Sequence, residues 1–241
     1  MVIITGNKTS KLLNLRSNGG DPKLLIHSRS PDGTTTFVDS SGQGHTVSVG
    51  AADVAHETDY YKWRSSSILF DGDSGYLTSA YHTDWDIFAE TNFNIDLWVK
   101  HDTVASTQAY ISQYENAENQ WMFCYTTGSG LRFYLVSGNS VVVDTDSAGL
   151  ISDTDWHHVA VCKVGDDYGT YLDGQQVGHT NDSSTDTLTG ALYIGYRHAG
   201  DLFFDGYMDE IALTHDNRFG AAPVAGLTDT ILVPNLGPYR I

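Results

Sequence analysis

Cysteine and long apolar runs are scarce in this sequence of 241 residues, and each shortage excludes a class of protein. Cys124 and Cys162 are the only cysteines, and both lie in strand-like runs, so we expect two buried free thiols rather than a disulfide scaffold. No apolar run approaches the roughly 18 residues that a membrane-spanning helix needs. Residues 2–4 are apolar, but polar residues follow at once, so a secretory signal is not expected. We therefore expect synthesis in the cytoplasm and no membrane segment.

Glutamate is also scarce, with 5 residues against 25 aspartates. Glutamate favours helix interiors, whereas aspartate favours turns and helix caps. The chain also contains 24 glycines and 14 tyrosines, which suit tight turns and strands respectively. Helical periodicity extends nowhere beyond a single short turn. The composition therefore predicts an all-β fold with many tight turns.

The charge is strongly negative and unevenly distributed. The net charge is −17, which repels nucleic acid and anionic membranes, so we expect neither as a partner. The first 30 residues depart from this pattern, with five basic residues against one acid. We interpret residues 1–22 as a basic arm that attaches to an acidic partner through Lys8, Lys11 and Arg16, and residues 23–241 as one domain. The alternative is that the charge serves solubility and suits calcium-rich surroundings.

Short strand-like runs recur about every 10 residues from Leu24 onward, with turn residues between them. Residues 93–100 alternate, with apolar side chains on one face and Trp98 on the other. Asp173 and Gly174 separate two further runs and predict a type I′ hairpin, because both residue types tolerate positive φ. This spacing is typical of an antiparallel β-sandwich or barrel.

Five sequence segments follow one another in the order typical of the laminin-G-like domains of the concanavalin A-like lectin/glucanase superfamily, and each resembles the corresponding motif of that family. The motifs are F-V-D-S-S-G at 37–42, S-I-L-F-D-G at 67–72, F-N-I-D-L-W-V at 93–99, W-H-H-V-A-V at 156–161 with Y-L-D-G-Q-Q-V-G at 171–178, and F-D-G-Y-M-D-E-I at 204–211. The resemblance implies an antiparallel, two-sheet jelly-roll sandwich. Within the superfamily, the chain is similar to modules of bacteriophage structural proteins.

The resemblance also implies a structural calcium ion where the early loop meets the penultimate strand. Calcium takes six to eight oxygen ligands. The residues that match this site are Asp39, Ser41 and Asp209. The alternative is that Asp39 opens an Asx-turn and Asp209 accepts backbone hydrogen bonds at a strand edge.

Catalytic motifs are missing. The glucanases that the sequence resembles use acids spaced E-x-D-x-E along one strand, and that spacing does not occur here. The sequence also lacks a G-x-S-x-G elbow and a glycine-rich phosphate loop. His157 and His158 are consecutive on a predicted strand and so point to opposite faces, which argues against a shared metal. We therefore predict that the protein is not an enzyme.

Aromatic side chains near turns point to sugar binding, because sugars bind to aromatic rings flanked by hydrogen-bonding groups. Such rings are supplied by Tyr60, Tyr61, Trp63, Tyr76, Tyr81, Trp85, Tyr110 and Tyr114. Of these, Tyr61, Trp63, Tyr81 and Trp85 are the glycan candidates. The same rings could equally pack against a neighbouring subunit or a capsid surface.

Two functions follow from these observations. The first is a virion accessory protein, a capsid decoration or tail-fibre-like protein, which docks on capsid or tail proteins through the basic arm and exposes a lectin-like sandwich. The alternative is a carbohydrate-binding adhesion module that recognises cell-surface glycans. Exposed sheet edges favour a homo-oligomer in either case, and the resemblance implies a trimer.

Overall fold

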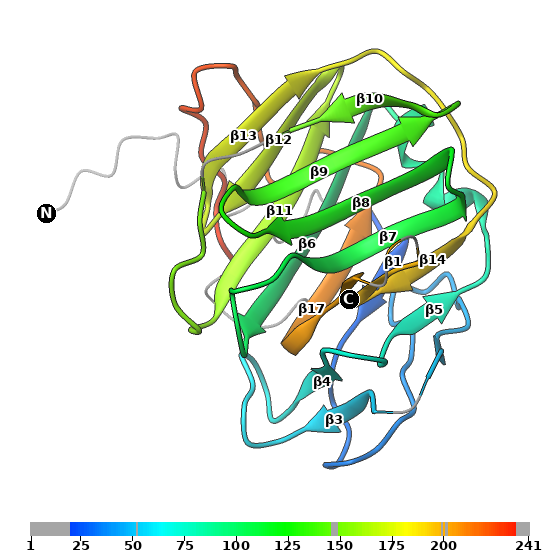
Figure 1. Ribbon diagram of the computed structural model, residues 1–241, viewed down its shortest axis with the longest axis vertical. Helices are drawn as coiled ribbons and strands as arrows, with labels where there is room; N and C mark the ends of the chain where they lie inside the picture. Colours follow the sequence, from blue (N-terminus) through cyan, green and yellow to red (C-terminus); the bar gives the residue numbers. More distant parts are fainter. Residues whose placement is uncertain (1–19, 52, 146–148, 199, 201, 235–241) are drawn as a thin grey trace, which may run out of the picture.

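The computed structural model describes residues 20–51, 53–145, 149–198, 200 and 202–234. In these residues two antiparallel sheets pack face to face (Figure 1). The order of sheet A is β13 (Gln175–Asn181), β12 (Asp167–Leu172), β11 (His157–Val164), β6 (Asn92–His101), β17 (Asp205–Thr214), β4 (Ser67–Asp71) and β3 (Ala55–Glu57), with β1 (Leu24–Ile26) also paired to β17. The order of sheet B is β10 (Ser140–Asp144), β9 (Gly130–Ser137), β8 (Asn119–Thr126), β7 (Gln108–Asn116), β14 (Ala191–Ile194), β5 (Leu77–Ser79) and β2 (Ser48–Val49). The predicted all-β, two-sheet antiparallel sandwich is confirmed.

Three small elements complete the described fold. A two-stranded ribbon consists of β15 (Tyr196–Arg197) and β16 (Leu202–Phe203). Two 3₁₀ helices, η1 (Thr83–Trp85) and η2 (Ile87–Ala89), connect sheet B to sheet A. No helix among the described residues is long and apolar enough to cross a membrane.

The core lies between the sheets and follows the alternation of the strands. In β6, Phe93, Ile95, Leu97 and Val99 are fully buried in the main core, whereas Trp98 lies on the opposite face. Burying one such aliphatic or aromatic side chain contributes about 1.5–3 kcal/mol before the conformational entropy cost is subtracted. The face of each sheet that points away from this core is called its outer face below.

The outer face of sheet A is covered by the chain itself. Residues 215–234 run beside β12 and β13 (Figure 1). Phe219 and Ile231 of this segment pack with Ala160, Cys162 and Tyr171 in a second apolar cluster. This segment therefore covers the outer face of sheet A over β11 and β12.

Both cysteines are free and buried, as predicted. Cys162 belongs to the cluster under residues 215–234, whereas Cys124 lies on the outer face of sheet B with Met122 and Tyr134. The thiols therefore lie on opposite sides of the sandwich. Burial raises the pKa of Cys124 to about 11, so its thiol stays protonated at neutral pH.

Candidate functional site

Aromatic rings gather on the outer face of sheet B. We call this group the tyrosine surface, and its members are Tyr76, Tyr114, Tyr193, Tyr196, His198 and Phe203. The rings form a continuous series of contacts. Tyr76 stacks on Tyr196 with 4.8 Å between ring centroids, Tyr196 stacks on Phe203 at 4.5 Å, and Tyr114 stacks on His198 at 4.6 Å. Tyr193 contacts Tyr76, Tyr196 and His198.

Strand register brings these residues to one face. Ser112 of β7 is paired with Tyr193 of β14, and Tyr114 is paired with Ala191, so these four side chains point outward together. Their neighbours Leu192 and Ile194 point into the core. The outward position of Tyr193 therefore follows from simple period-2 alternation.

The β15–β16 ribbon adds the remaining rings. The Ser112 hydroxyl donates a hydrogen bond of 2.7 Å to the carbonyl oxygen of Tyr196, which holds the ribbon over β7. Gly195 precedes the ribbon with a φ of 75°, and a Cβ at this position would lie 2.4 Å from the ring of Phe70. Only glycine allows the chain to turn here so close to the core.

The rings of the tyrosine surface remain partly open to solvent. Tyr196 is buried beneath the others, whereas Tyr76, Tyr114 and Tyr193 are half-buried and His198 is exposed. Burial, with contributions from Tyr76 and Tyr114, raises the pKa of Tyr193, so its hydroxyl remains a hydrogen-bond donor at neutral pH. Flat rings with hydroxyl groups at the edge suit the apolar face and the polar rim of a sugar ring.

Polar side chains extend the same outer face along β8, β9 and β10. The guanidinium group of Arg132 lies over the ring of Tyr134, 4.9 Å from its centroid, and donates hydrogen bonds of 2.9 and 2.6 Å to both oxygens of Asp144. Arg197 of β15 donates a hydrogen bond of 3.1 Å to Gln120 Oε1. These groups are held in place before any ligand arrives, which lowers the entropic cost of binding.

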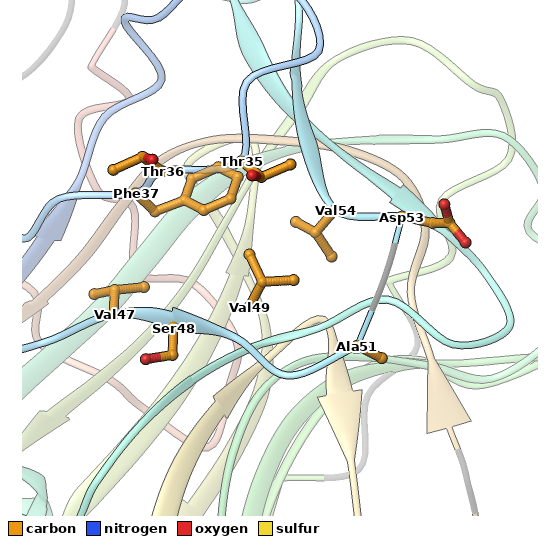
Figure 2. Close-up of a pocket in the computed structure, with 9 residues that line it drawn as sticks. All are labelled: Thr35, Thr36, Phe37, Val47, Ser48, Val49, Ala51, Asp53 and Val54. Carbon is orange, nitrogen blue, oxygen red and sulfur yellow. The ribbon is translucent and has the colours of Figure 1, made fainter.

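A separate hollow of about 590 Å³ lies between residues 35–37 and the segment that contains β2 (Figure 2). Phe37, Val49 and Val54 point toward one another at its centre, whereas Asp53 points away (Figure 2). Phe37 is buried, so the hollow offers no exposed aromatic ring among its lining residues. It therefore matches the requirements of sugar binding less well than the tyrosine surface does.

The four predicted glycan residues are not brought together. Trp85 is fully buried in the core and donates its ring N–H to the carbonyl oxygen of Ala80, so its ring is not available to a ligand, contrary to the expectation from sequence. Tyr81 is exposed and donates a hydrogen bond to Asp86. Tyr61 is 47% exposed, and Trp63 packs edge-on against Trp98 of sheet A.

The tyrosine surface contains only two of the aromatic residues singled out from sequence, Tyr76 and Tyr114. Tyr193 alternates with the buried Leu192 and Ile194, and this period-2 pattern is the sequence signal that indicates its outward position. The contribution of His198 and Phe203 depends on how the ribbon folds over β7, and no local pattern indicates that.

The residues predicted for calcium are occupied by hydrogen bonds within the protein. Asp39 Oδ1 accepts from the backbone of Leu25 and Ser41, and Oδ2 accepts from the Ser41 hydroxyl and from the backbone of His45. This arrangement is an Asx-turn, the alternative considered from sequence.

Asp209, the third residue of the predicted calcium site, accepts from the backbone of Trp63 and Glu210. Burial and the adjacent Glu210 raise the pKa of Asp209 well above its usual range. No hydrogen bond connects Asp209 with Asp39, and calcium binding stays a prediction.

The residues predicted for attachment, Lys8, Lys11 and Arg16, lie outside the described residues. Nothing in the structure therefore bears on the basic arm.

Comparison with protein families gives a match over residues 71–218 to the family described as the concanavalin A-like lectin/glucanases superfamily. A sequence search among curated proteins finds no match.

Solved structures give further matches, at identities that inform the fold alone. Domain 4 of AbnA, an extracellular GH43 arabinanase of Geobacillus stearothermophilus determined with arabinotriose, aligns with a TM-score of 0.62 and 14% identity over 81% of this chain and 94% of that domain. A botulinum neurotoxin type C structure, from a study of ganglioside-dependent cell entry, aligns with a TM-score of 0.60 and 13% identity over 85% of this chain. The binding domain of botulinum neurotoxin DC, determined with rat synaptotagmin II, aligns with a TM-score of 0.62 and 12% identity over 81% of this chain. The chain spans about half the length of these two toxin structures.

Proposed function

Since the chain belongs to the concanavalin A-like lectin/glucanase superfamily, we propose that it is a non-enzymatic carbohydrate-binding domain whose tyrosine surface holds the sugar. The observation that supports this most directly is the continuous series of half-buried rings on one outer face of the sandwich. Two proteins of the same fold have carbohydrate ligands. They are the arabinanase domain determined with arabinotriose and the neurotoxin whose cell entry depends on gangliosides. Their ligands are their own, and we extend only the class of ligand to this chain.

The charge of the chain narrows the class of sugar. A net charge of −17 repels sialylated, sulfated and uronic acid glycans. Near the tyrosine surface, Arg132 is paired with Asp144 in two hydrogen bonds and Arg197 donates to Gln120 Oε1, so the negative charge of the whole chain decides against an acidic sugar. We therefore infer a neutral oligosaccharide as the ligand.

The absence of catalysis is part of the proposal. Glycoside hydrolysis generally requires two carboxyl groups on either side of the scissile bond. Asp144, a carboxylate on this outer face, accepts two hydrogen bonds from Arg132 and is not positioned as a free acid or nucleophile. None of the six members of the tyrosine surface is a carboxylic acid, and their rings and hydroxyl groups suit holding a sugar.

The test is a glycan array followed by titration of the best hit with wild type, Tyr193→Ala and Tyr61→Ala. We expect Tyr193→Ala to weaken binding about tenfold or more, equivalent to about 1.4 kcal/mol, because it removes a central ring of the surface. Tyr61→Ala is the matched control, an exposed tyrosine away from the tyrosine surface, and should bind like wild type. An array without neutral glycan hits, or a loss confined to Tyr61→Ala, would contradict the proposal.

The role of the chain in a virus particle stays a prediction, as do its location in the virion and its oligomeric state. The test is a pull-down with virus-like particles that compares the full chain with residues 23–241. If Lys8, Lys11 and Arg16 dock the chain, the shortened form loses particle binding and keeps glycan binding.

A further inference from the structure

Two histidines converge on one carboxylate oxygen at the end of the molecule where the loop before β2 meets η1. His45 Nε2 lies 3.0 Å from Asp84 Oδ2, and His82 Nδ1 lies 3.1 Å from the same atom. The three atoms all lie within 4.8 Å of one another. His45 is distant in sequence from the other two residues, so the fold and not a local turn creates this convergence.

Two groups of Asp84 approach the same nitrogen of His82. The backbone N–H of Asp84 lies 3.1 Å from His82 Nδ1 and donates a hydrogen bond to it when that nitrogen carries no proton. The carboxylate oxygen Oδ2 of Asp84 faces the same nitrogen at 3.1 Å. Because this nitrogen has a single lone pair, a metal ion bound to it would replace the backbone hydrogen bond and would lie beside Oδ2.

A carboxylate oxygen shared by two imidazole rings distinguishes the cluster from other histidine–acid pairs of the protein. His179 contacts Asp167, and His158 contacts Asp96, each as a single ring beside a carboxylate. Those contacts are ordinary hydrogen bonds between one donor and one acceptor. At Asp84, by contrast, a single oxygen serves two imidazole rings.

Surrounding contacts hold the three groups in position. The backbone N–H of His45 donates to Asp39, and its ring packs against Trp85 with 4.5 Å between centroids. Lys23 Nζ lies 3.5 Å from Asp84 Oδ1, the other oxygen, which orients the carboxylate and leaves Oδ2 toward the histidines. Partners of this kind behind the ligands are a common property of metal sites, where they orient the ligating rings.

We propose that His45, His82 and Asp84 form a binding site for a divalent transition metal ion, with Zn²⁺ as the best match. Zinc binds histidine nitrogens at about 2.0–2.1 Å and aspartate oxygens at about 2.0–2.2 Å, so neighbouring ligand atoms of a tetrahedral site lie roughly 3.3 Å apart. The two contacts to Asp84 Oδ2 are within a few tenths of an ångström of this value. A water molecule would supply the fourth ligand.

The ligand types discriminate between metals. Two imidazole nitrogens and one carboxylate suit zinc and its neighbours in the first transition row, whereas calcium requires six to eight oxygens. The side chains of His45 and Asp84 are 9% and 12% exposed, and that of His82 is 52% exposed. An ion can therefore enter past His82 into a largely buried carboxylate. Once bound, it would tie the loop before β2 to the β5–β6 connection.

The experiment uses the full chain without a histidine tag, stripped with a chelator and dialysed. Zn²⁺ is titrated by calorimetry, and Co²⁺ is added in parallel because its visible absorption reports tetrahedral coordination. We expect one ion per chain, a tetrahedral Co²⁺ spectrum and a rise in the thermal midpoint with Zn²⁺. Calcium should produce none of these changes at this site.

Variants locate the site. His82→Ala removes an exposed ligand with little risk to folding and should weaken Zn²⁺ binding at least tenfold and abolish the Co²⁺ spectrum. His179→Ala is the matched control, since His179 contacts one carboxylate only, and should bind Zn²⁺ like wild type. Absence of binding by wild type, or unchanged binding by a folded His82→Ala, would overturn the proposal.

Discussion

His101 is a fully buried histidine in the core between the sheets. The Tyr110 hydroxyl donates a hydrogen bond of 2.9 Å to its Nε2, and its Nδ1 donates one of 3.1 Å to Gln108 Oε1, so the neutral ring satisfies both partners. Burial lowers the pKa of His101 to about 4, whereas an unfolded chain would have about 6.5. The folded protein therefore excludes a proton that the unfolded chain accepts.

This difference predicts a loss of stability in acid. The contribution of His101 is complete above pH 6.5 and is lost as the pH falls toward 4, because only the unfolded chain gains a proton in that window. The loss amounts to roughly 3 kcal/mol in the free energy of unfolding. Urea titrations at several pH values measure the free energy of unfolding. Between pH 4 and 6.5 this free energy should change less with pH for His101→Gln than for wild type.

His157 provides the control for this measurement. Its hydrogen bond to Asp173 raises its pKa, against the opposing effect of burial, so its contribution is lost as the pH rises above 6.5. Over the range above pH 4, His157→Gln should therefore alter the pH dependence of the free energy of unfolding only above pH 6.5. If His101→Gln follows the wild type below pH 6.5, the acid sensitivity arises elsewhere.

The residue scale is also where sequence was least informative about the site. Trp85 and Tyr81 are close neighbours in sequence, yet one ring is buried and the other exposed. Their difference arises from η1, a single turn that rotates Trp85 into the core, and no repeating pattern precedes it. The pair Asp173–Gly174, by contrast, was predictable because its turn type depends on two adjacent residues alone.

Among the elements, the hairpin between β12 and β13 is the one that sequence described best. Asp173 has a φ of 48° and Gly174 one of 85°, as a two-residue turn of this type requires. The C-terminal segment also reaches this turn, because the backbone N–H of Ile231 donates a hydrogen bond of 2.9 Å to the carbonyl oxygen of Gly174. The hairpin therefore anchors residues 215–234 as well as connecting two strands.

A substitution at this turn should cost more than one at an open turn. In Gly174→Ala the new Cβ would lie 2.7 Å from the Ile231 carbonyl oxygen, at a positive φ. Gly138 of the β9–β10 turn also has a positive φ but no atom within 4 Å. We expect a loss of about 1 kcal/mol for Gly138→Ala and at least about 2 kcal/mol for Gly174→Ala in urea unfolding. Equal losses in the two variants would mean that residues 215–234 move away from the new Cβ without a loss of stability.

Strand β7 of sheet B is not indicated by any of the sequence motifs. Its residues include Gln108, Ser112 and Gln113, which resemble a polar loop but are buried. Gln113 accepts a hydrogen bond from the ring N–H of Trp121 and donates to two backbone carbonyl groups, so its burial costs little. A register shift at Tyr110 further breaks the alternation that would have identified the strand. Strand β17 of sheet A also shifts register, between Asp209 and Ala212, but the motif at residues 204–211 indicates it.

At the scale of the whole molecule, the two thiols report on the two outer faces separately. Cys124 and Cys162 are both buried, and burial raises the pKa of each. A thiol that is protonated and inaccessible does not attack a disulfide reagent. The folded protein should therefore resist labelling on both sides of the sandwich.

Labelling with Ellman's reagent gives the measurement. We expect no reaction from the native chain over minutes and release of two equivalents after unfolding in guanidinium chloride. Cys124→Ser and Cys162→Ser identify which thiol responds. Rapid labelling of Cys162 in the native state would show that residues 215–234 lift from sheet A.

The cover on sheet A has a consequence for how such a protein can change over evolutionary time. A substitution at Ala160 or Tyr171 must be matched by one in the segment that packs on it, so that side of the sandwich can accept new sequences only in concert. Tyr193 and His198 border solvent, so a substitution there changes ring contacts at the surface and leaves the core between the sheets closed. New binding preferences can therefore arise on the outer face of sheet B through substitutions that leave the protein folded.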